Sequence, residues 1–372
     1  MEKVINNSAE CYAVLADVLT EKNIQNLLLV CDNAFDFLCV KEDILRLQTI
    51  CNIVKFDDFS PNPDYESVCK GVETFNQNSC TAILAIGGGS AIDVAKCIKL
   101  YANMDSQHNY LQQEIVENDI TLIAIPTTAG TGSEATRYAV IYYKGEKQSV
   151  THMSCIPKYV LLIPDLLKTL PLYQKKATML DALCHSIESY WSVNSTDESK
   201  KLSQQALQMI LANLQGYIDN DDKGNENMLI AANLAGKAIN ITQTTAGHAL
   251  CYKLSSMFSV AHGHAAAWSM LYVWEFMLKN MDKVCDQRGS EYVAGVFCDI
   301  AKSIGHKTPA AAIKFLKNLL VVLDLEMKFD ITQEQLETLA NSVNVTRLKN
   351  NPVALTKQDV MDIYCDLFKK IS

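Results

Sequence analysis

The stretch AIGGGSAIDVAK, residues 85–96, decides the fold prediction. Its start belongs to an apolar run, TAILAIGGGS (81–90), which predicts a buried strand ending in three consecutive glycines. A helical pattern follows directly. Glycines let a backbone approach a ligand closely, and a helix N-terminus favours a phosphate. The stretch is therefore either a phosphate-binding turn or a tight strand-to-helix turn with no ligand, and it is not a G-x-G-x-x-G fingerprint.

Similar apolar runs surround this one in the first 170 residues. They predict strands over NLLLVCD (26–32), NIVKFDDF (52–59) and ITLIAIPTT (120–128). The segments between them, such as YESVCKGVETFNQ (65–77), show helical spacing. Buried strands that alternate with helices are typical of a parallel sheet with helices on both faces, so we expect an α/β domain here.

The pattern changes after TLPLYQKK (169–176), where long helical segments replace the strands. One such helix is expected to begin at Ser195-Thr-Asp-Glu198, which reads as a capping box. Another covers NENMLIAANLAGKAINI (225–241). The sequence thus predicts two domains: an α/β domain over 1–170 and an all-α domain over 171–372.

Composition excludes several classes of function. The chain has 372 residues and a net charge of -9, and an acidic surface repels the phosphate backbone of nucleic acids. No apolar run is long enough for a membrane span. The 13 cysteines lie mostly in apolar runs without C-x-x-C pairs, which is typical of reduced thiols. With no basic and apolar leader at the N-terminus, we expect a cytoplasmic protein that binds neither nucleic acid nor membrane.

A second polar loop follows the last of these strands. IPTTAGTGSEAT (125–136) is rich in Thr, Gly and Ser, whose hydroxyls and amides suit a diphosphate. In open α/β sheets, nucleotides bind at the carboxyl ends of the strands. Two such loops together predict a dinucleotide site.

Histidine is scarce and clustered. Of seven histidines, three fall in TAGHALCYKLSSMFSVAHGHA (245–265). In DALCHSIESY (181–190), Asp181 and His185 are four residues apart and share one helix face. With His248 and His262 they form a donor set that suits a divalent transition metal. The alternative is that these histidines are ordinary core residues and that the Asp–His pair only hydrogen-bonds.

Taken in order, GGGSAIDVAK, IPTTAGTGSE, DALCHSIESY and the HA…AHGHA segment resemble the iron-containing (group III) alcohol dehydrogenases. SPNPDYESV (60–68) resembles a further segment of that family. The resemblance implies a Rossmann-like first domain, a helical second domain, an active site between them and a homodimer. It implies an NAD(P)-dependent oxidoreductase acting on an alcohol or aldehyde.

The resemblance also assigns residues. The implied ligands of Fe²⁺, with Zn²⁺ as the alternative, are Asp181, His185, His248 and His262. The implied contacts of NAD(H) are Asp32, Asn62, Gly88, Gly89, Ser90, Asp93, Thr127, Thr128, Ser133 and Lys147. A carboxylate at the end of the first strand repels a 2′-phosphate, so Asp32 predicts NADH rather than NADPH, with NADP(H) as the alternative.

The proton donor departs from the family pattern. Many members carry a second histidine four residues after the first ligand of the last segment, where this chain has Tyr252. Tyr252 donates the proton, or a water does and Tyr252 only packs on the nicotinamide; both readings stay open. His264 is expected to line the pocket near the ligands.

The substrate prediction rests on Arg137, just after the second loop. TTAGHALCYKL with AHGHAAA resembles the family's phosphonoacetaldehyde reductase branch, which makes 2-hydroxyethylphosphonate, and a guanidinium holds two phosphonate oxygens at once. Arg137 could instead form a structural ion pair with Glu134. The rival activities are a general short-chain aldehyde or alcohol dehydrogenase of the butanol or 1,3-propanediol type, a dehydroquinate synthase-like lyase, and a scaffold without turnover.

Overall fold

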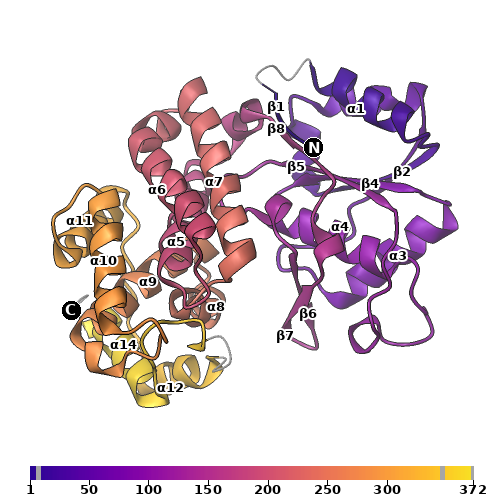
Figure 1. Ribbon diagram of the computed structural model, residues 1–372. Helices are drawn as coiled ribbons and strands as arrows, with labels where there is room; N and C mark the ends of the chain where they lie inside the picture. The colour runs from indigo at the N-terminus through magenta and orange to yellow at the C-terminus, as the bar shows by residue number, and fades with distance from the viewer. Residues whose placement is uncertain (6–9, 344–347, 370–372) are drawn as a thin grey trace. The chain divides into compact units, whose positions relative to one another are not determined.

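The computed structural model describes residues 1–5, 10–343 and 348–369 of the chain (Figure 1). It divides into two compact units. The first comprises Met1–Pro171 with Asp219–Ile230, and the second comprises Leu172–Ile218 with Ala231–Ser372. The segment Asp219–Ile230 therefore groups with the first unit, although it follows a long stretch of the second.

A parallel sheet of six strands organises the first unit, in the order β1-β8-β5-β4-β2-β3. All four strands expected from the sequence are present, and β1 and β8 are additional. Their bounds are Glu2–Val4 (β1), Asn26–Cys31 (β2), Asn52–Phe56 (β3), Ala82–Gly87 (β4), Thr121–Pro126 (β5) and Tyr159–Leu162 (β8). The predicted α/β class is confirmed.

The central strands are buried on both faces, which explains why they read as unbroken apolar runs. Along β2, Leu27, Leu29 and Cys31 belong to one hydrophobic core. Leu28 and Val30 belong to the other. The first core takes in α1 (Cys11–Glu21) and α2 (Lys41–Arg46), and the second takes in α3 (Tyr65–Gln77) and α4 (Gly89–Tyr101). Figure 1 shows α1 on one side of the sheet and α3 and α4 on the other.

An antiparallel hairpin stands apart from this sheet. It consists of β6 (Tyr138–Tyr143) and β7 (Glu146–Thr151), which pair only with each other among the named strands. The hairpin packs against α4, and Ala139, Ile141 and Val150 join the second core. In the chain, the hairpin lies between the second polar loop and β8.

The second unit is built from helices, as expected. Its first helix, α5 (Leu172–Trp191), packs against α6 and α9. The helices after α5 are α6 (Asp197–Ile218), α7 (Asp222–Thr242), α8 (Ala246–Phe258), α9 (His262–Lys279), α10 (Ser290–Ser303), α11 (Pro309–Val322), α12 (Gln333–Ser342) and α14 (Lys357–Lys369). The first residues of α7 belong to the first unit.

The expected capping box at Ser195 and Glu198 is wrong by one residue. The backbone N–H of Ser199 donates to Thr196 Oγ1, and the N–H of Thr196 donates to Ser199 Oγ. Thr196 is therefore the cap. The hydroxyl and carbonyl of Ser195 instead accept hydrogen bonds from Arg288.

Across the described residues, none of the helices combines the length and the apolar character that crossing a membrane requires.

Candidate nucleotide and metal sites

Three chain segments meet at the carboxyl edge of the sheet. Asp32 follows β2, Gly88 follows β4 and Thr127 follows β5. β4 neighbours both other strands, and the Thr127 N–H donates to the Gly87 carbonyl at 3.0 Å. β2 lies between β3 and β4, and the chain passes from β2 to β3 on one side and then returns to β4 on the other. The edge between β2 and β4 is therefore a topological switch point, where open α/β sheets bind nucleotides.

Neighbouring atoms leave little room for side chains in the loop Gly87–Gly89, which explains why glycines occupy it. Gly87 has a φ of 155°, and an added Cβ would lie 2.7 Å from that of Ala91. At Gly89, a Cβ would lie 2.9 Å from Cγ2 of Thr131, in the second loop. At Gly88 it would meet only Thr128, at 3.5 Å. The two loops thus pack directly on each other. Gly88 has no contact as close as those of Gly87 and Gly89, and it lies just before the N-terminus of α4, where a phosphate is favoured; we call this turn the nucleotide cradle.

A buried network of polar side chains connects the glycine loop with the loop after β5. Asp93 accepts from the Ser133 hydroxyl at 2.5 Å and from the Val140 N–H at 2.9 Å. Lys96 Nζ, which is 0% exposed, donates to Ser133 Oγ and to the carbonyls of Thr136 and Tyr138. Burial raises the pKa of Asp93 and lowers the pKa of Lys96, and the charge of each group opposes the shift of the other. Asp93 and Ser133 therefore bridge the loops, and sequence reasoning missed Lys96.

The other expected nucleotide contacts border the same edge. Asp32 Oδ1 caps the turn after β2 by accepting from the Ala34 N–H, and its Oδ2 lies 3.6 Å from the position of a Cβ on Gly87. The N–H of Asn62 donates to the Ser90 hydroxyl at 3.4 Å, which brings the SPNPDYESV turn to the start of α4. Lys147, on β7, is close enough for its charge to lower the pKa of Asp93.

The metal-ligand candidates come together in the second unit, on three helices. Asp181 and His185 lie on α5, His248 on the first turn of α8 and His262 at the first residue of α9. Close packing of α9 on α5 brings His262 near the residues on α5. A Cβ on Gly263 would lie 2.0 Å from the Ala177 carbonyl and 2.7 Å from Asp181 Cβ, so the glycine of AHGHA is required for the approach.

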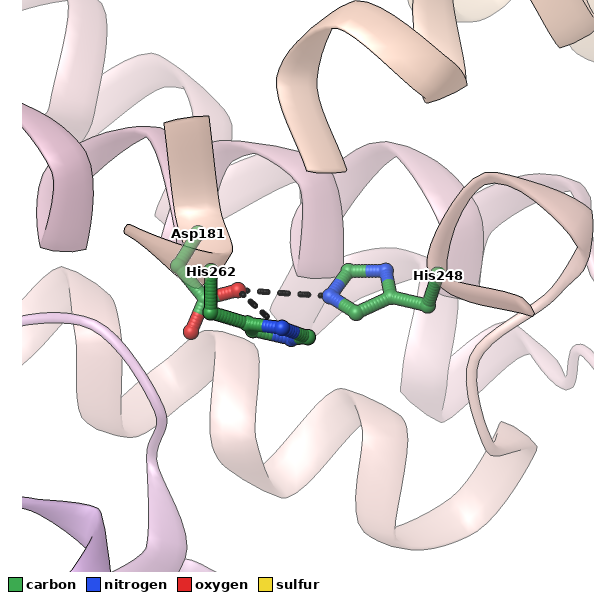
Figure 2. A group of neighbouring side chains, drawn as sticks. All are labelled: Asp181, His248 and His262. Atoms are coloured by element: carbon green, nitrogen blue, oxygen red, sulfur yellow. Dashed lines mark hydrogen bonds and ion pairs between the residues drawn. The ribbon is translucent and has the colours of Figure 1, made fainter. Parts of the chain in front are cut away.

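Asp181 Oδ1 is the centre of the cluster. It lies 3.3 Å from His248 Nε2 and 3.8 Å from His262 Nε2, and Figure 2 shows both rings directed at this one oxygen. Donor atoms of these three residues all lie within 4.8 Å of one another. Ligands of one zinc-sized ion at about 2.0–2.2 Å from it stand roughly 3–4 Å apart, so the set fits a divalent transition metal.

His185 lies at the margin of this group. Its Nε2 is 3.7 Å from Asp181 Oδ1, and its ring stacks on that of His248 with centroids 4.6 Å apart. It is outside the set of three whose donors are mutually within 4.8 Å. The fourth predicted ligand is therefore adjacent to the group, and its coordination stays a prediction.

The electrostatics favour a cation. Burial lowers the pKa of His248, but Glu188 and Asp181 outweigh burial and raise it to about 9. Burial raises the pKa of Asp181, but the charges of His185 and His262 and the bond from His248 hold it well below its usual range. A buried carboxylate thus remains charged among imidazoles. The His262 side chain is 40% exposed, which leaves one side of the cluster open to a further ligand.

Sequence reasoning missed Glu188, which is buried beside the cluster. Its carboxylate accepts from His248 Nδ1 at 3.0 Å. The available signal was the spacing Asp181-x3-His185-x2-Glu188, because residues i, i+4 and i+7 share one helix face.

Tyr252 and His264 occupy different surroundings. The half-buried Tyr252 ring stacks on His262, with centroids 5.4 Å apart and an interplanar angle of 19°. His264 is buried, and its Nε2 bonds the Leu325 carbonyl at 2.8 Å while its Nδ1 lies 3.2 Å from the Tyr173 hydroxyl. Both His264 ring nitrogens thus contact the protein itself, and burial lowers its pKa. Tyr252 therefore contacts a residue of the metal-ligand cluster.

Arg137 directly precedes the hairpin and is half-buried. Its Nε donates to the Tyr138 hydroxyl at 3.1 Å, and its Nη1 lies 3.7 Å from the sulfur of Met153. These contacts hold the guanidinium against the base of β6.

Two family models cover nearly the whole chain. Iron-containing alcohol dehydrogenase matches residues 3–164, and the C-terminal domain of the Fe-containing alcohol dehydrogenase family matches residues 175–368. The chain belongs to the iron-containing alcohol dehydrogenase family. This is a family of oxidoreductases that use iron and NAD(H), and the expected family is confirmed.

Curated relatives agree. The chain is similar to the probable alcohol dehydrogenase EutG of Escherichia coli (strain K12), at 34% identity over 62% of this chain and 58% of the relative. The chain thus spans less than two thirds of that relative's length. It is 28% identical to 4-hydroxybutyrate dehydrogenase of Clostridium kluyveri over 82% of this chain and 84% of the relative.

Solved structures show the same fold. One is described as an iron containing alcohol dehydrogenase, with a TM-score of 0.83 and 27% identity, covering 99% of this chain and 97% of that one. Another is sulfoacetaldehyde reductase from Bifidobacterium kashiwanohense in complex with NAD⁺, with a TM-score of 0.85 and 24% identity, covering 99% and 96%.

Proposed function

We propose that this chain catalyses the reversible reduction of a short aldehyde to a primary alcohol by NADH at a divalent metal. The cluster of Asp181 with three histidines carries the proposal, because a carboxylate and imidazoles suit iron(II) or zinc(II). The cradle at Gly88 and the loop that follows β5 supply the second requirement, a place for a diphosphate.

Bound cofactors would supply the chemistry of the reaction: the cation stabilises negative charge on the substrate oxygen and the nicotinamide provides hydride. The chain's own residues do the rest. Asp181, His185, His248 and His262 hold the cation. Amides at the start of α4 bind the diphosphate, and Asp32 accepts from ribose hydroxyls. Tyr252, stacked on His262, is placed to donate a proton from its hydroxyl, unless a water at the open side of the cluster does so.

A metal-depletion experiment tests this activity. Protein treated with a chelator should not oxidise NADH in the presence of a short aldehyde, and iron(II) or zinc(II) added back without oxygen should restore the rate. Full activity of metal-free protein would contradict the proposal. A lyase of the dehydroquinate synthase type uses NAD only transiently, so sustained NADH consumption, one per aldehyde, separates it from the dehydrogenase.

Within this class we propose phosphonoacetaldehyde as the substrate and Arg137 as its anchor. A guanidinium binds two oxygens of a phosphonate at once, and charge-assisted hydrogen bonds of this kind contribute about 1.5–3 kcal/mol each. The name of the 4-hydroxybutyrate dehydrogenase relative gives partial support, since 4-hydroxybutyrate also carries an anionic group. The rival is a plain short aldehyde such as butanal.

Two variants distinguish these substrates. Arg137→Ala should raise KM for phosphonoacetaldehyde at least tenfold and leave turnover of butanal unchanged. Lys144→Gln is the matched control, because it removes a positive charge from the exposed turn of the same hairpin. Equal use of both aldehydes by the wild-type protein, unaffected by Arg137→Ala, would favour the general aldehyde reductase.

A further inference from the structure

Glu188 accepts three hydrogen bonds from the short segment that ends at the metal-site histidine His248, and two of them come from His248 itself. It lies on α5 and is 0% exposed. Its Oε2 accepts from the Thr245 N–H at 2.7 Å and from His248 Nδ1 at 3.0 Å. Its Oε1 accepts from the His248 N–H at 3.0 Å. Burying a carboxylate costs free energy unless hydrogen-bond donors satisfy it, and these three donors do so for Glu188.

These bonds fix the helix that carries His248. The side chain of Thr245, which precedes α8, makes no capping hydrogen bond. Glu188 supplies the missing acceptor from another helix, and its negative charge lies at the positive end of the α8 dipole. The start of α8, and with it the backbone of His248, is therefore anchored to α5.

The same carboxylate also determines how the imidazole is protonated. An ionised carboxylate only accepts hydrogen bonds, so His248 Nδ1 must carry a hydrogen. In the neutral ring this leaves the lone pair on Nε2, the atom that lies 3.3 Å from Asp181 Oδ1.

Gly247 makes room for this contact. A Cβ at that position would lie 2.1 Å from Glu188 Oε1 and 2.9 Å from Met270 Cα. No other residue fits without moving the carboxylate away from His248.

We propose that Glu188 is a positioning residue that selects Nε2 of His248 as the metal-donating nitrogen. The inference rests on the proposed function only in taking this cluster to be the metal site. Partners of this kind usually change metal affinity about 10–100-fold when they are lost.

The wild-type protein tests the inference directly. Zinc-loaded protein labelled with ¹⁵N-histidine should show His248 with hydrogen on Nδ1 and zinc on Nε2, assigned by comparison with His248→Gln. Zinc on Nδ1 would overturn the inference while leaving the proposed function intact. Failure of the wild-type protein to bind zinc would overturn the metal site, and the inference with it.

A variant pair gives a second test, read as zinc affinity in competition with a chelator. Glu188→Gln replaces one acceptor oxygen with a donor, and should weaken zinc binding at least tenfold. Ser186→Ala is the matched control, because Ser186 is equally buried on α5 and its hydroxyl donates to the Ala182 carbonyl of its own helix. Unchanged affinity of a folded Glu188→Gln protein would contradict the inference. If that variant does not fold, the tautomer measurement on the wild-type protein still decides.

Discussion

The Ser133 hydroxyl donates a hydrogen bond to Asp93 Oδ1 at 2.5 Å, although the two residues follow different strands. Asp93 lies on α4 after the glycine loop, and Ser133 lies in the loop after β5. The buried Lys96 ammonium donates to the same Ser133 hydroxyl. The shape of the nucleotide cradle therefore depends on a buried network as well as on the glycines.

Removal of the buried ammonium should loosen both loops. Lys96→Met leaves the Thr136 and Tyr138 carbonyls without their donor and Asp93 without its nearby positive charge. We expect the free energy of unfolding to fall by about 3 kcal/mol and KM for NADH to rise more than kcat falls.

Lys99→Met is the control, since Lys99 lies on the same helix and donates only a long bond to the Asn118 carbonyl, at 3.5 Å. Urea unfolding and NADH titration of both variants check the prediction. An identical loss of NADH affinity in the two variants would contradict a specific role of Lys96 in supporting the nucleotide-binding loops.

The two loop glycines should fail in different ways. Gly89→Ala forces a Cβ to within 2.9 Å of Thr131, so it should lower stability as well as NADH affinity. Gly88→Ala meets Thr128 at an ordinary 3.5 Å, so it should fold normally and lose NADH affinity alone. Thermal unfolding with NADH fluorescence titration separates the effects, and Gly295→Ala, which meets nothing within 4 Å, is the control. Wild-type NADH affinity in Gly88→Ala would contradict the cradle.

Gly263→Ala should destroy the metal cluster. The new methyl group would overlap the Ala177 carbonyl and push α9 from α5, which separates His262 from Asp181. We expect loss of tight zinc binding and a lower unfolding temperature, measured by chelator competition and calorimetry. A variant that retained wild-type zinc affinity would show that the helix contact does not hold the cluster.

Alkaline pH should destabilise the protein through its buried thiols. Burial raises the pKa of Cys11 and of Cys31 to about 12. In the unfolded chain these thiols ionise near pH 9, so the folded state binds more protons above that pH and stability falls as pH rises, until about pH 12. Each thiol contributes up to about 1.4 kcal/mol per pH unit.

Urea unfolding between neutral pH and about pH 11 measures this slope. Cys11→Ala and Cys31→Val should each flatten it, whereas the exposed Cys39→Ala should not. A slope that none of these substitutions changes would assign the alkaline instability to other groups.

The nucleotide preference depends on Asp32. Its carboxylate is held at the end of β2 by the Ala34 N–H, where it would repel a 2′-phosphate. We expect Asp32→Gly to lower kcat/KM for NADH and raise it for NADPH. A variant that gains nothing with NADPH would count against this role.

Much of the fold could be predicted because the central strands are buried on both faces, so Leu27 to Cys31 appear as one apolar run. β1 was missed because three residues carry too little pattern. The hairpin was missed because β7, EKQSVT, is mostly polar. The capping box was misplaced because Ser195 and Thr196 are chemically similar as caps, and the contact of Ser195 with the distant Arg288 leaves no local pattern in the sequence.

For the candidate sites, spacing indicated the ligands on α5 because Asp181 and His185 share a helix face. The contacts of His248 and His262 with them depend on helix packing at Gly263, which no local pattern reveals. Lys96 and Glu188 were missed for the same reason, since a charged residue within an apolar helix indicates burial only once its partners are known.

The most direct test of the central claim follows the hydride itself. Iron(II)-reconstituted protein is given NADH carrying deuterium at the transferable position of the nicotinamide, with phosphonoacetaldehyde or butanal, in the absence of oxygen. The account predicts one deuterium on the alcohol carbon for each NADH consumed, and none with Asp181→Asn. Alcohol without deuterium, or no NADH consumed with either aldehyde, would contradict it.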